Sequence, residues 1–298
     1  HERNRGRAAA VNTGLKAAKH DLVLIVDDDI YASPDMVSRL VYEFTLRRTD
    51  QLALAARPTW DPDAPLTLTM RWLEEMGPYL DTASTQSRPL ANLSTGCTMM
   101  WKPFLLANGG FDEHFTHFGL EDIELSLRLK PLGLDVRLLS SAVGYRHRSM
   151  KVHDLIRREF REGLSAVYLH SRFPEHIPQV DDLDDLLRNE KQVQQAEEAA
   201  DELGLLEQAG IRNMPSGAAD LFLLVYRHHF LRGVLSGLRE MGAGGRRVEG
   251  SATRAIYNEA SRLEAIREFD EARRLFRLVL HRGDQEYLAG AEYHLGHI

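Results

Sequence analysis

Three consecutive aspartates, Asp27, Asp28 and Asp29, follow a run of apolar residues at 22–26. The run is rich in Val and Leu and predicts a buried strand. Because alternate side chains of an extended chain point to the same side, Asp27 and Asp29 can face one ligand together. Paired carboxylates suit Mg²⁺ or Mn²⁺, which keep coordination positions open for phosphates. The triplet predicts a metal and phosphate site at a strand end, and a solvated acidic loop is the alternative.

A second acidic group follows a glycine-rich turn. Residues 109–113 read Gly-Gly-Phe-Asp-Glu, and Glu121 and Asp122 come at the predicted start of a helix, after Gly119. A carboxylate in that position can point into a cleft and act as a general base. Helix capping and interaction with the helix dipole explain acidic residues in a first turn without any catalysis. The pattern alone leaves both interpretations open.

A third candidate is the segment Tyr-Arg-His-Arg at 145–148. A neutral imidazole such as that of His147 is a good ligand for a transition-like divalent ion, and arginines such as Arg148 suit phosphate oxygens. The chain has 13 histidines, and a lone histidine is more often a surface or core residue than a ligand. His147 therefore gains weight only in combination with the other groups.

Helices and strands must position these candidate residues. The hydrophobic pattern predicts that helices and strands alternate along the chain. Because helices and short apolar strands alternate, we predict an α/β fold with a parallel or mixed sheet that has helices on its faces. Ligands bind at the carboxyl ends of the strands in such sheets. The predicted helices are 8–19, 33–47, 121–130 and 151–169, and the predicted strands are 22–26, 52–56, 98–101 and 136–139.

The order of the motifs resembles the family 2 glycosyltransferases with the GT-A fold. The resemblance lies in a strand ending in Asp-x-Asp, a Gly-Gly-Phe-Asp-Glu turn, a Glu-Asp pair that opens a helix, and a histidine beyond the next strand. It covers roughly residues 4–150. It implies a nucleotide-sugar-binding mixed sheet flanked by helices. We expect the family's first strand–helix–strand unit, which holds the nucleotide base, to be missing from this chain.

The resemblance also implies a reaction and a role for each matching residue. The reaction is transfer of a sugar, a hexose by default, from a nucleotide-sugar donor such as a UDP-sugar to a hydroxyl of a saccharide, glycan or other acceptor. Transfer would invert the anomeric configuration and use Mn²⁺ or Mg²⁺. The implied roles are general base for Asp122 with Glu121 beside it, metal ligand for Asp27, Asp29 and His147, and substrate binding for Arg7, Asn12, Asp27, Asp28, Gly96 and Arg148.

The remainder of the chain is helical in pattern. We predict three regions: a partial transferase domain at 1–150, a helical extension at 151–245, and a separate helical segment at 251–298. Residues 268–273 of the last segment resemble a tetratricopeptide repeat, whose small residues let helices pack closely. An ordinary helical hairpin explains the same pattern. A repeat would imply a protein partner.

Composition narrows the class of protein. The chain has 298 residues and a formal net charge of −7, from 37 Lys and Arg against 44 Asp and Glu. This acidic balance argues against a nucleic-acid partner bound through a basic face. The single cysteine, Cys97, excludes an internal disulfide and indicates a reducing compartment, so we expect a cytoplasmic protein. No apolar run approaches the roughly 18 residues of a membrane span.

Two other functions fit parts of the sequence. A nucleotidyltransferase can share an α/β nucleotide-binding fold and acidic metal ligands. The Gly-Gly-Phe-Asp-Glu turn followed by a Glu-Asp pair argues against it. A non-catalytic scaffold could use the C-terminal helices to bind proteins while the first half is degenerate. The presence of Asp27, Asp29, Asp122 and His147 argues against degeneration.

Overall fold

The computed structural model describes residues 5–76, 87–89, 93–173 and 190–243. The chain divides into two compact units. The first comprises His1–Val152 and Gly204–Ala219, and the second comprises His153–Leu203 and Asp220–Ile298. The predicted repeat at 251–298 and the residues just before it lie outside the described residues.

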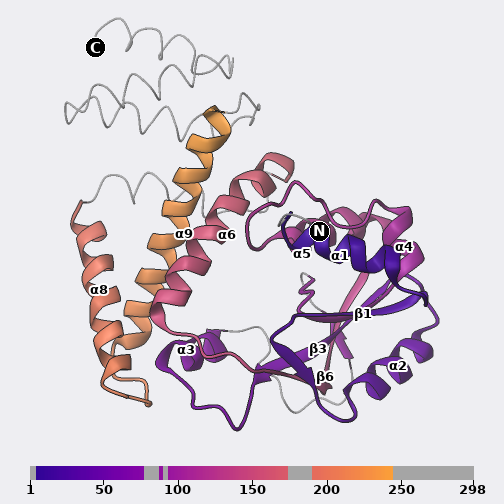
Figure 1. Ribbon diagram of the computed structural model, residues 1–298, viewed down its shortest axis with the longest axis horizontal. Helices are drawn as coiled ribbons and strands as arrows, with labels where there is room; N and C mark the ends of the chain where they lie inside the picture. Colours follow the sequence, from indigo (N-terminus) through magenta and orange to yellow (C-terminus); the bar gives the residue numbers. More distant parts are fainter. Residues whose placement is uncertain (1–4, 77–86, 90–92, 174–189, 244–298) are drawn as a thin grey trace, which may run out of the picture. The chain divides into compact units, whose positions relative to one another are not determined.

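The first unit is built on one mixed sheet (Figure 1). The strand order is β1-β5-β3-β6-β2, and β4 also pairs with β6. Strand β5 runs antiparallel to β1 and β3, whereas β3 and β6 are parallel. The strands are β1 (Leu22–Val26), β2 (Ile30–Ala32), β3 (Leu52–Trp60), β4 (Ser87–Pro89), β5 (Cys97–Trp101) and β6 (Asp135–Arg146).

Helices cover both faces of this sheet, because successive residues of a strand point to opposite faces. Ala53 of β3 belongs to a core with residues of α1, α4 and α5. Its neighbours Leu52 and Leu54 belong to a second core with residues of α2. The helices of this unit are α1 (Arg7–Ala17), α2 (Met36–Arg47), α3 (Leu68–Met76), α4 (Lys102–Ala107) and α5 (Glu121–Leu129). The predicted mixed sheet flanked by helices is confirmed.

The sheet extends further than the hydrophobic pattern predicted. Strand β6 runs from Asp135 to Arg146, whereas the sequence predicted only 136–139. Its pairing with β3 is interrupted, since Ala56 faces Leu139 but Arg57 faces Val143. Three residues of β6 are therefore unmatched at this bulge. The second half of β6 carries few large apolar side chains, which is why periodicity missed it, and it brings Arg146 opposite Ile30 of β2.

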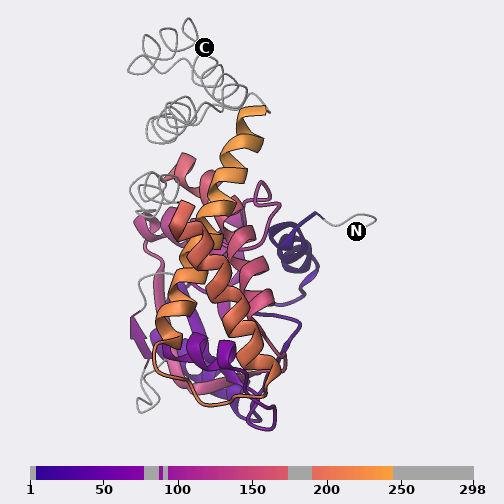
Figure 2. The ribbon, with the colours of Figure 1, turned by 90° about the vertical axis from the view of Figure 1, so that its left-hand side faces the viewer.

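The described residues of the second unit are helical, as predicted. They belong to α6 (Val152–Arg172), to α9 (Ala218–Ala243) and to the part of α8 (Glu190–Gln208) that ends at Leu203. Helices α6 and α9 lie side by side in both views (Figures 1 and 2). They approach so closely that a Cβ atom on Gly163 would lie 2.0 Å from the carbonyl oxygen of Phe230. A Cβ atom on Gly233 would lie equally close to that of Phe160. Glycine at both positions is what permits this contact.

Among the helices that the structure describes, none combines the length and the apolar character that a membrane span requires.

Candidate active site

Three predicted segments meet at the carboxyl end of β1. The backbone N–H of Asp27 donates to the carbonyl oxygen of Gly96 at 2.8 Å, just where β1 and β5 stop pairing. The backbone N–H of His147 donates to the carbonyl oxygen of Asp29 at 2.7 Å. The structure therefore brings together the aspartate triplet, Gly96 and His147, which the sequence singled out separately.

Two arginines neutralise the Asp27 carboxylate. The guanidinium of Arg7 donates to one carboxylate oxygen of Asp27. The guanidinium of Arg146 lies 3.5 Å from the other oxygen, and its Nε lies 3.6 Å from Oδ1 of Asp29. Arg146 was not among the predicted site residues. Its neighbour Arg148, which was, is exposed and has no ion pair with any residue in the described ranges.

Gly96 leaves room for this arrangement. A Cβ atom at Gly96 would lie 2.9 Å from Oδ2 of Asp27 and 3.7 Å from Nη2 of Arg146. A separation of 2.9 Å is below the normal contact distance between carbon and oxygen. Any side chain at Gly96 would therefore push the Asp27 carboxylate away from its arginine partner.

Arg7 links the triplet to the predicted catalytic pair. Besides Asp27, it donates to Oε1 of Glu121 at 2.7 Å. Glu121 is 1% exposed, and its Oε2 has no hydrogen-bond partner among the described residues. The two acidic groups of the sequence thus share one cation, although Arg7 and Glu121 are 114 residues apart.

Asp122 is half-buried beside Glu121, at the first turn of α5. Its carboxylate accepts from the backbone N–H of Ile123 at 2.9 Å and from that of Thr95 at 3.3 Å. Burial and the neighbouring charge of Glu121 nevertheless raise the pKa of Asp122 to about 7. A carboxylate with a pKa in this range is well matched to general-base work near neutral pH. The residue before the pair, Leu120, has a left-handed φ of 69°.

His147 has a partner that the sequence did not indicate. Its Nδ1 lies 2.6 Å from Oδ2 of Asp61, which follows β3 and is 5% exposed. The hydrogen bond from His147 lowers the pKa of Asp61. The opposite edge of the imidazole is open, because the side chain is 74% exposed. Asp61 therefore orients the ring without enclosing it.

Asn12 lies against the glycine-rich turn, and its side-chain N–H groups donate to the carboxylate of Glu113 at 3.0 Å as well as to the backbone of the turn. Its side-chain N–H donates to the carbonyl oxygen of Phe111 at 2.8 Å, and its Oδ1 accepts from the backbone N–H of Phe111 at 2.9 Å. A Cβ atom on Gly110 would lie 2.6 Å from this Oδ1. Asn12 holds the turn that precedes α5, which is a positioning role. Asp28 is exposed and has no ion pair within the part of the chain that the structure describes.

The described residues contain no ready-made cluster of three or more His, Cys, Asp or Glu side chains for a metal ion. One atom nevertheless suits a cation: Oδ1 of Asp29 is buried and has no hydrogen-bond partner within the described ranges. Mg²⁺-type ions in phosphate sites commonly take only one or two carboxylates from the protein and complete their coordination with phosphate oxygens and water. The residues present fit that mode and do not fit an all-protein cage.

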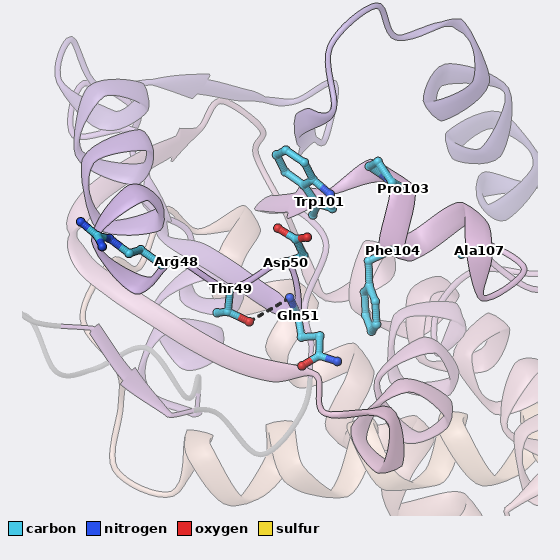
Figure 3. A pocket seen from close by; sticks show the side chains of 8 residues that line it. All are labelled: Arg48, Thr49, Asp50, Gln51, Trp101, Pro103, Phe104 and Ala107. Carbon is cyan, nitrogen blue, oxygen red and sulfur yellow. Dashed lines mark hydrogen bonds between the residues drawn. The ribbon is translucent and has the colours of Figure 1, made fainter.

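A separate hollow of about 560 Å³ lies at the opposite end of β1 (Figure 3). Trp101 in its wall pairs with Leu22, the first residue of β1, whereas Asp27 follows the last residue of that strand. The hollow is therefore distinct from the carboxylate site. Its lining residues are Arg48, Thr49, Asp50, Gln51, Trp101, Pro103, Phe104 and Ala107.

Comparison with known proteins adds family information. Residues 1–106 match the family model of glycosyl transferase family 2, and residues 82–154 match the model described as the N-terminal domain of galactosyltransferase. No curated protein matches the chain. One similar solved structure is the crystal structure of GalNAc-T7 with UDP, GalNAc and Mn²⁺. The identity is 15% and the TM-score 0.39, over 50% of this chain and 31% of that chain. So weak a likeness supports no conclusion about ligands or activity.

The two family matches between them span the sheet, its flanking helices and every side chain of the carboxylate site. They agree with the mixed sheet and with the order of motifs along it. These two matches support the predicted family 2 glycosyltransferase with a GT-A-like mixed sheet for residues 1–154.

Proposed function

We propose that this domain transfers a hexose from a nucleotide-sugar donor to an acceptor hydroxyl, with Asp122 as the general base. The observation that carries the proposal is the link through Arg7. It joins Asp27, at the end of β1, to Glu121, the neighbour of Asp122, and we propose that the donor binds at this strand end. The pKa of about 7 lets Asp122 be ionised before the reaction and accept a proton during it.

The proposed step is a single displacement. The acceptor oxygen forms a bond to the anomeric carbon as the bond from that carbon to the donor phosphate breaks, and the bonding pair leaves with the nucleoside diphosphate. Asp122 takes the proton of the acceptor hydroxyl. Because the acceptor oxygen displaces the diphosphate in a single step, the configuration at the anomeric carbon inverts.

The diphosphate would lie near Arg146 and Arg7, whose guanidinium groups suit phosphate oxygens. We propose that Asp29 and His147, together with Asp27, hold a Mn²⁺ or Mg²⁺ ion that arrives with the donor. The ion would neutralise charge on the leaving diphosphate. Oδ1 of Asp29 supports this role, because it is buried and accepts no hydrogen bond from the described residues, although Nε of Arg146 lies 3.6 Å away. A UDP-sugar is the donor we would test first.

The decisive experiment uses the full 298-residue chain and a panel of nucleotide sugars with Mn²⁺, and measures release of the nucleoside diphosphate with and without saccharide acceptors. Asp122→Asn should lower turnover by about 10²-fold or more, because the amide cannot take the acceptor proton. Asp50→Asn is the matched control and should leave turnover unchanged, because Asp50 is an exposed carboxylate just before β3, at the opposite end of the strands. Equal turnover by the Asp122→Asn and Asp50→Asn variants would remove Asp122 from its role.

The metal site has its own test. Calorimetry with Mn²⁺ and UDP should show weaker metal-dependent nucleotide binding for Asp29→Ala. Unchanged metal-dependent affinity would contradict the assignment of Asp29, whatever the turnover assay shows.

A further inference from the structure

The helical unit contains a small pocket between α6 and α9, with a volume of about 260 Å³. Four lining residues come from α6 and two from α9. They are Ile156, Arg157, Phe160, Arg161, His229 and Arg232. Half of these side chains carry a permanent positive charge, although the chain as a whole is acidic, with a formal charge of −7.

The positive charge in the pocket is largely uncompensated. Arg157 donates to Asp154 at 2.7 Å and so shares its charge with a carboxylate. Arg161 and Arg232 are exposed, and neither has an ion pair with a residue in the described part of the chain. Arginines that line one pocket, two of them without a described carboxylate partner, favour an anion, and the planar donors of their guanidinium groups match phosphate oxygens.

His229 adds a buried polar group to the pocket wall. Its side chain is 7% exposed, and its Nε2 has no hydrogen-bond partner among the residues that the structure describes. Burial, together with His228 and Arg232, lowers the pKa of His229 to about 4, so the imidazole is neutral near pH 7. A buried polar atom without a partner is costly. A ligand oxygen that reached this ring would satisfy it.

The two remaining side chains that line the pocket are apolar and half-buried. Ile156 and Phe160 lie on α6, and the carbonyl oxygen of Phe160 faces Gly233 at the close crossing of the two helices. The backbones of α6 and α9 approach each other directly at Gly163 and Gly233. The distance between these two helices, which form the pocket walls, therefore does not depend on flexible side chains. The pocket therefore combines a rigid apolar surface with a cationic rim.

We propose that this pocket binds a phosphate monoester that carries an apolar organic group. Arg161, Arg232 and Arg157 bind the phosphate, and Ile156 and Phe160 contact the apolar group. The site lies wholly within the helical unit and uses none of the residues assigned to sugar transfer. It is therefore an addition to the proposed transferase function and does not depend on it.

The test titrates the full chain with octyl phosphate, inorganic phosphate and octanol by isothermal calorimetry. We expect one molar equivalent of octyl phosphate to bind, at least about tenfold more tightly than inorganic phosphate, because only the ester fills the apolar part of the pocket. Octanol should not bind. Octyl phosphate that binds no more tightly than inorganic phosphate would overturn the proposal, as would equal binding of octanol.

Variants separate this site from general electrostatic attraction. Combined Arg161→Ala and Arg232→Ala should weaken octyl phosphate binding by about tenfold or more. The matched control combines Lys19→Ala and Arg212→Ala, which removes the same charge from exposed positions elsewhere. Equal weakening in both double variants would show attraction to the overall charge and overturn the site. Thermal melting checks that folding is retained, as expected for exposed side chains.

Discussion

Nδ1 of His147 lies 2.6 Å from Oδ2 of Asp61, so an exposed imidazole is held by a buried carboxylate from a strand end 86 residues away. An imidazole that donates from Nδ1 to a carboxylate presents Nε2 as its free acceptor. Carboxylates that orient metal-binding histidines in this way raise the basicity of the ligand and fix its tautomer. The pair therefore prepares His147 for the metal role proposed above.

The first prediction is that Asp61→Asn weakens Mn²⁺ binding in the presence of UDP by about tenfold, because the ring loses its fixed orientation. Calorimetric titration of Mn²⁺ measures this. Asp63→Asn, which removes an exposed carboxylate two residues away, should have no effect. If the two variants bind Mn²⁺ equally well, Asp61 has only a structural role.

Local sequence pattern predicted the parts of the site that depend on one segment. Asp27 and Asp29 follow an apolar run, and Asp122 comes in a first helical turn. All three could therefore be assigned to an element from the residues next to them in the sequence. Asp61 and Arg146 could not. Their positions depend on the pairing of β3 with β6 beyond the bulge, where Trp60 faces Arg146. Nothing in the local hydrophobic pattern encodes the length of that pairing.

Asn12 illustrates the opposite difficulty. A polar residue in a motif near the donor was predicted to bind substrate. The structure shows its amide bonded to both backbone groups of Phe111. Sequence alone cannot tell a side chain that contacts a ligand from one that holds the loop beside it. The same is true of Glu124, which is fully buried and pairs with Arg128, itself bonded to the carbonyl oxygens of Asn108 and Gly110.

The second prediction concerns pH. The pKa of Asp122 is raised to about 7 by burial and by Glu121, and Arg7 opposes the shift. The base must be ionised to accept a proton, so kcat/KM should rise with pH and level off above about 7. Glu121→Gln removes the neighbouring negative charge. It also removes the ion pair between Glu121 and Arg7, so that less of the positive charge of Arg7 is neutralised. Both changes lower the pKa of Asp122. The rising limb should therefore move to lower pH. A limb that stays in place or moves to higher pH would contradict this origin of the shift.

The third prediction uses the close approach at Gly96. Gly96→Ala places a Cβ atom 2.9 Å from Oδ2 of Asp27, so the carboxylate must move and its contact with Arg146 must lengthen. We expect UDP binding with Mn²⁺ to weaken by about tenfold or more, a loss on the order of 1–2 kcal/mol that is typical for overpacking.

Gly14→Ala is the matched control for this change. Gly14 lies in α1, and a Cβ atom there would meet nothing within 4 Å. The substitution should raise stability by about 0.5–1 kcal/mol, because alanine is the better helix former, and should leave nucleotide binding unchanged. Equal nucleotide binding by the two variants would show that the Asp27 carboxylate accommodates the methyl group.

The fourth prediction concerns stability in the helical unit. Glu159 of α6 is fully buried, and neither carboxylate oxygen has a hydrogen-bond partner among the described residues. Its one described ion pair, with Nε of Arg158, is long at 3.7 Å. Burial and the charge of Glu162 raise the pKa of Glu159 to about 8, from an ordinary value of 4.5. The folded protein therefore keeps this carboxyl protonated at neutral pH.

The sign of the effect on folding follows from that difference. Below pH 4.5 the group is protonated in the folded and the unfolded chain, so it causes no pH dependence. Between about 4.5 and 8 the unfolded chain releases the proton and the folded chain retains it, which favours unfolding increasingly as pH rises.

Glu159→Gln abolishes this loss of stability, because the amide does not titrate. At pH 8 the variant should exceed the parent protein in free energy of unfolding by an amount on the order of 4 kcal/mol, and at pH 5 by much less. Calorimetric melting at the two pH values measures the difference. Glu202→Gln on α8 changes an exposed carboxylate and should give the same small shift at both. A gain for Glu159→Gln that does not grow with pH would mean that the buried carboxyl is not held protonated in the fold.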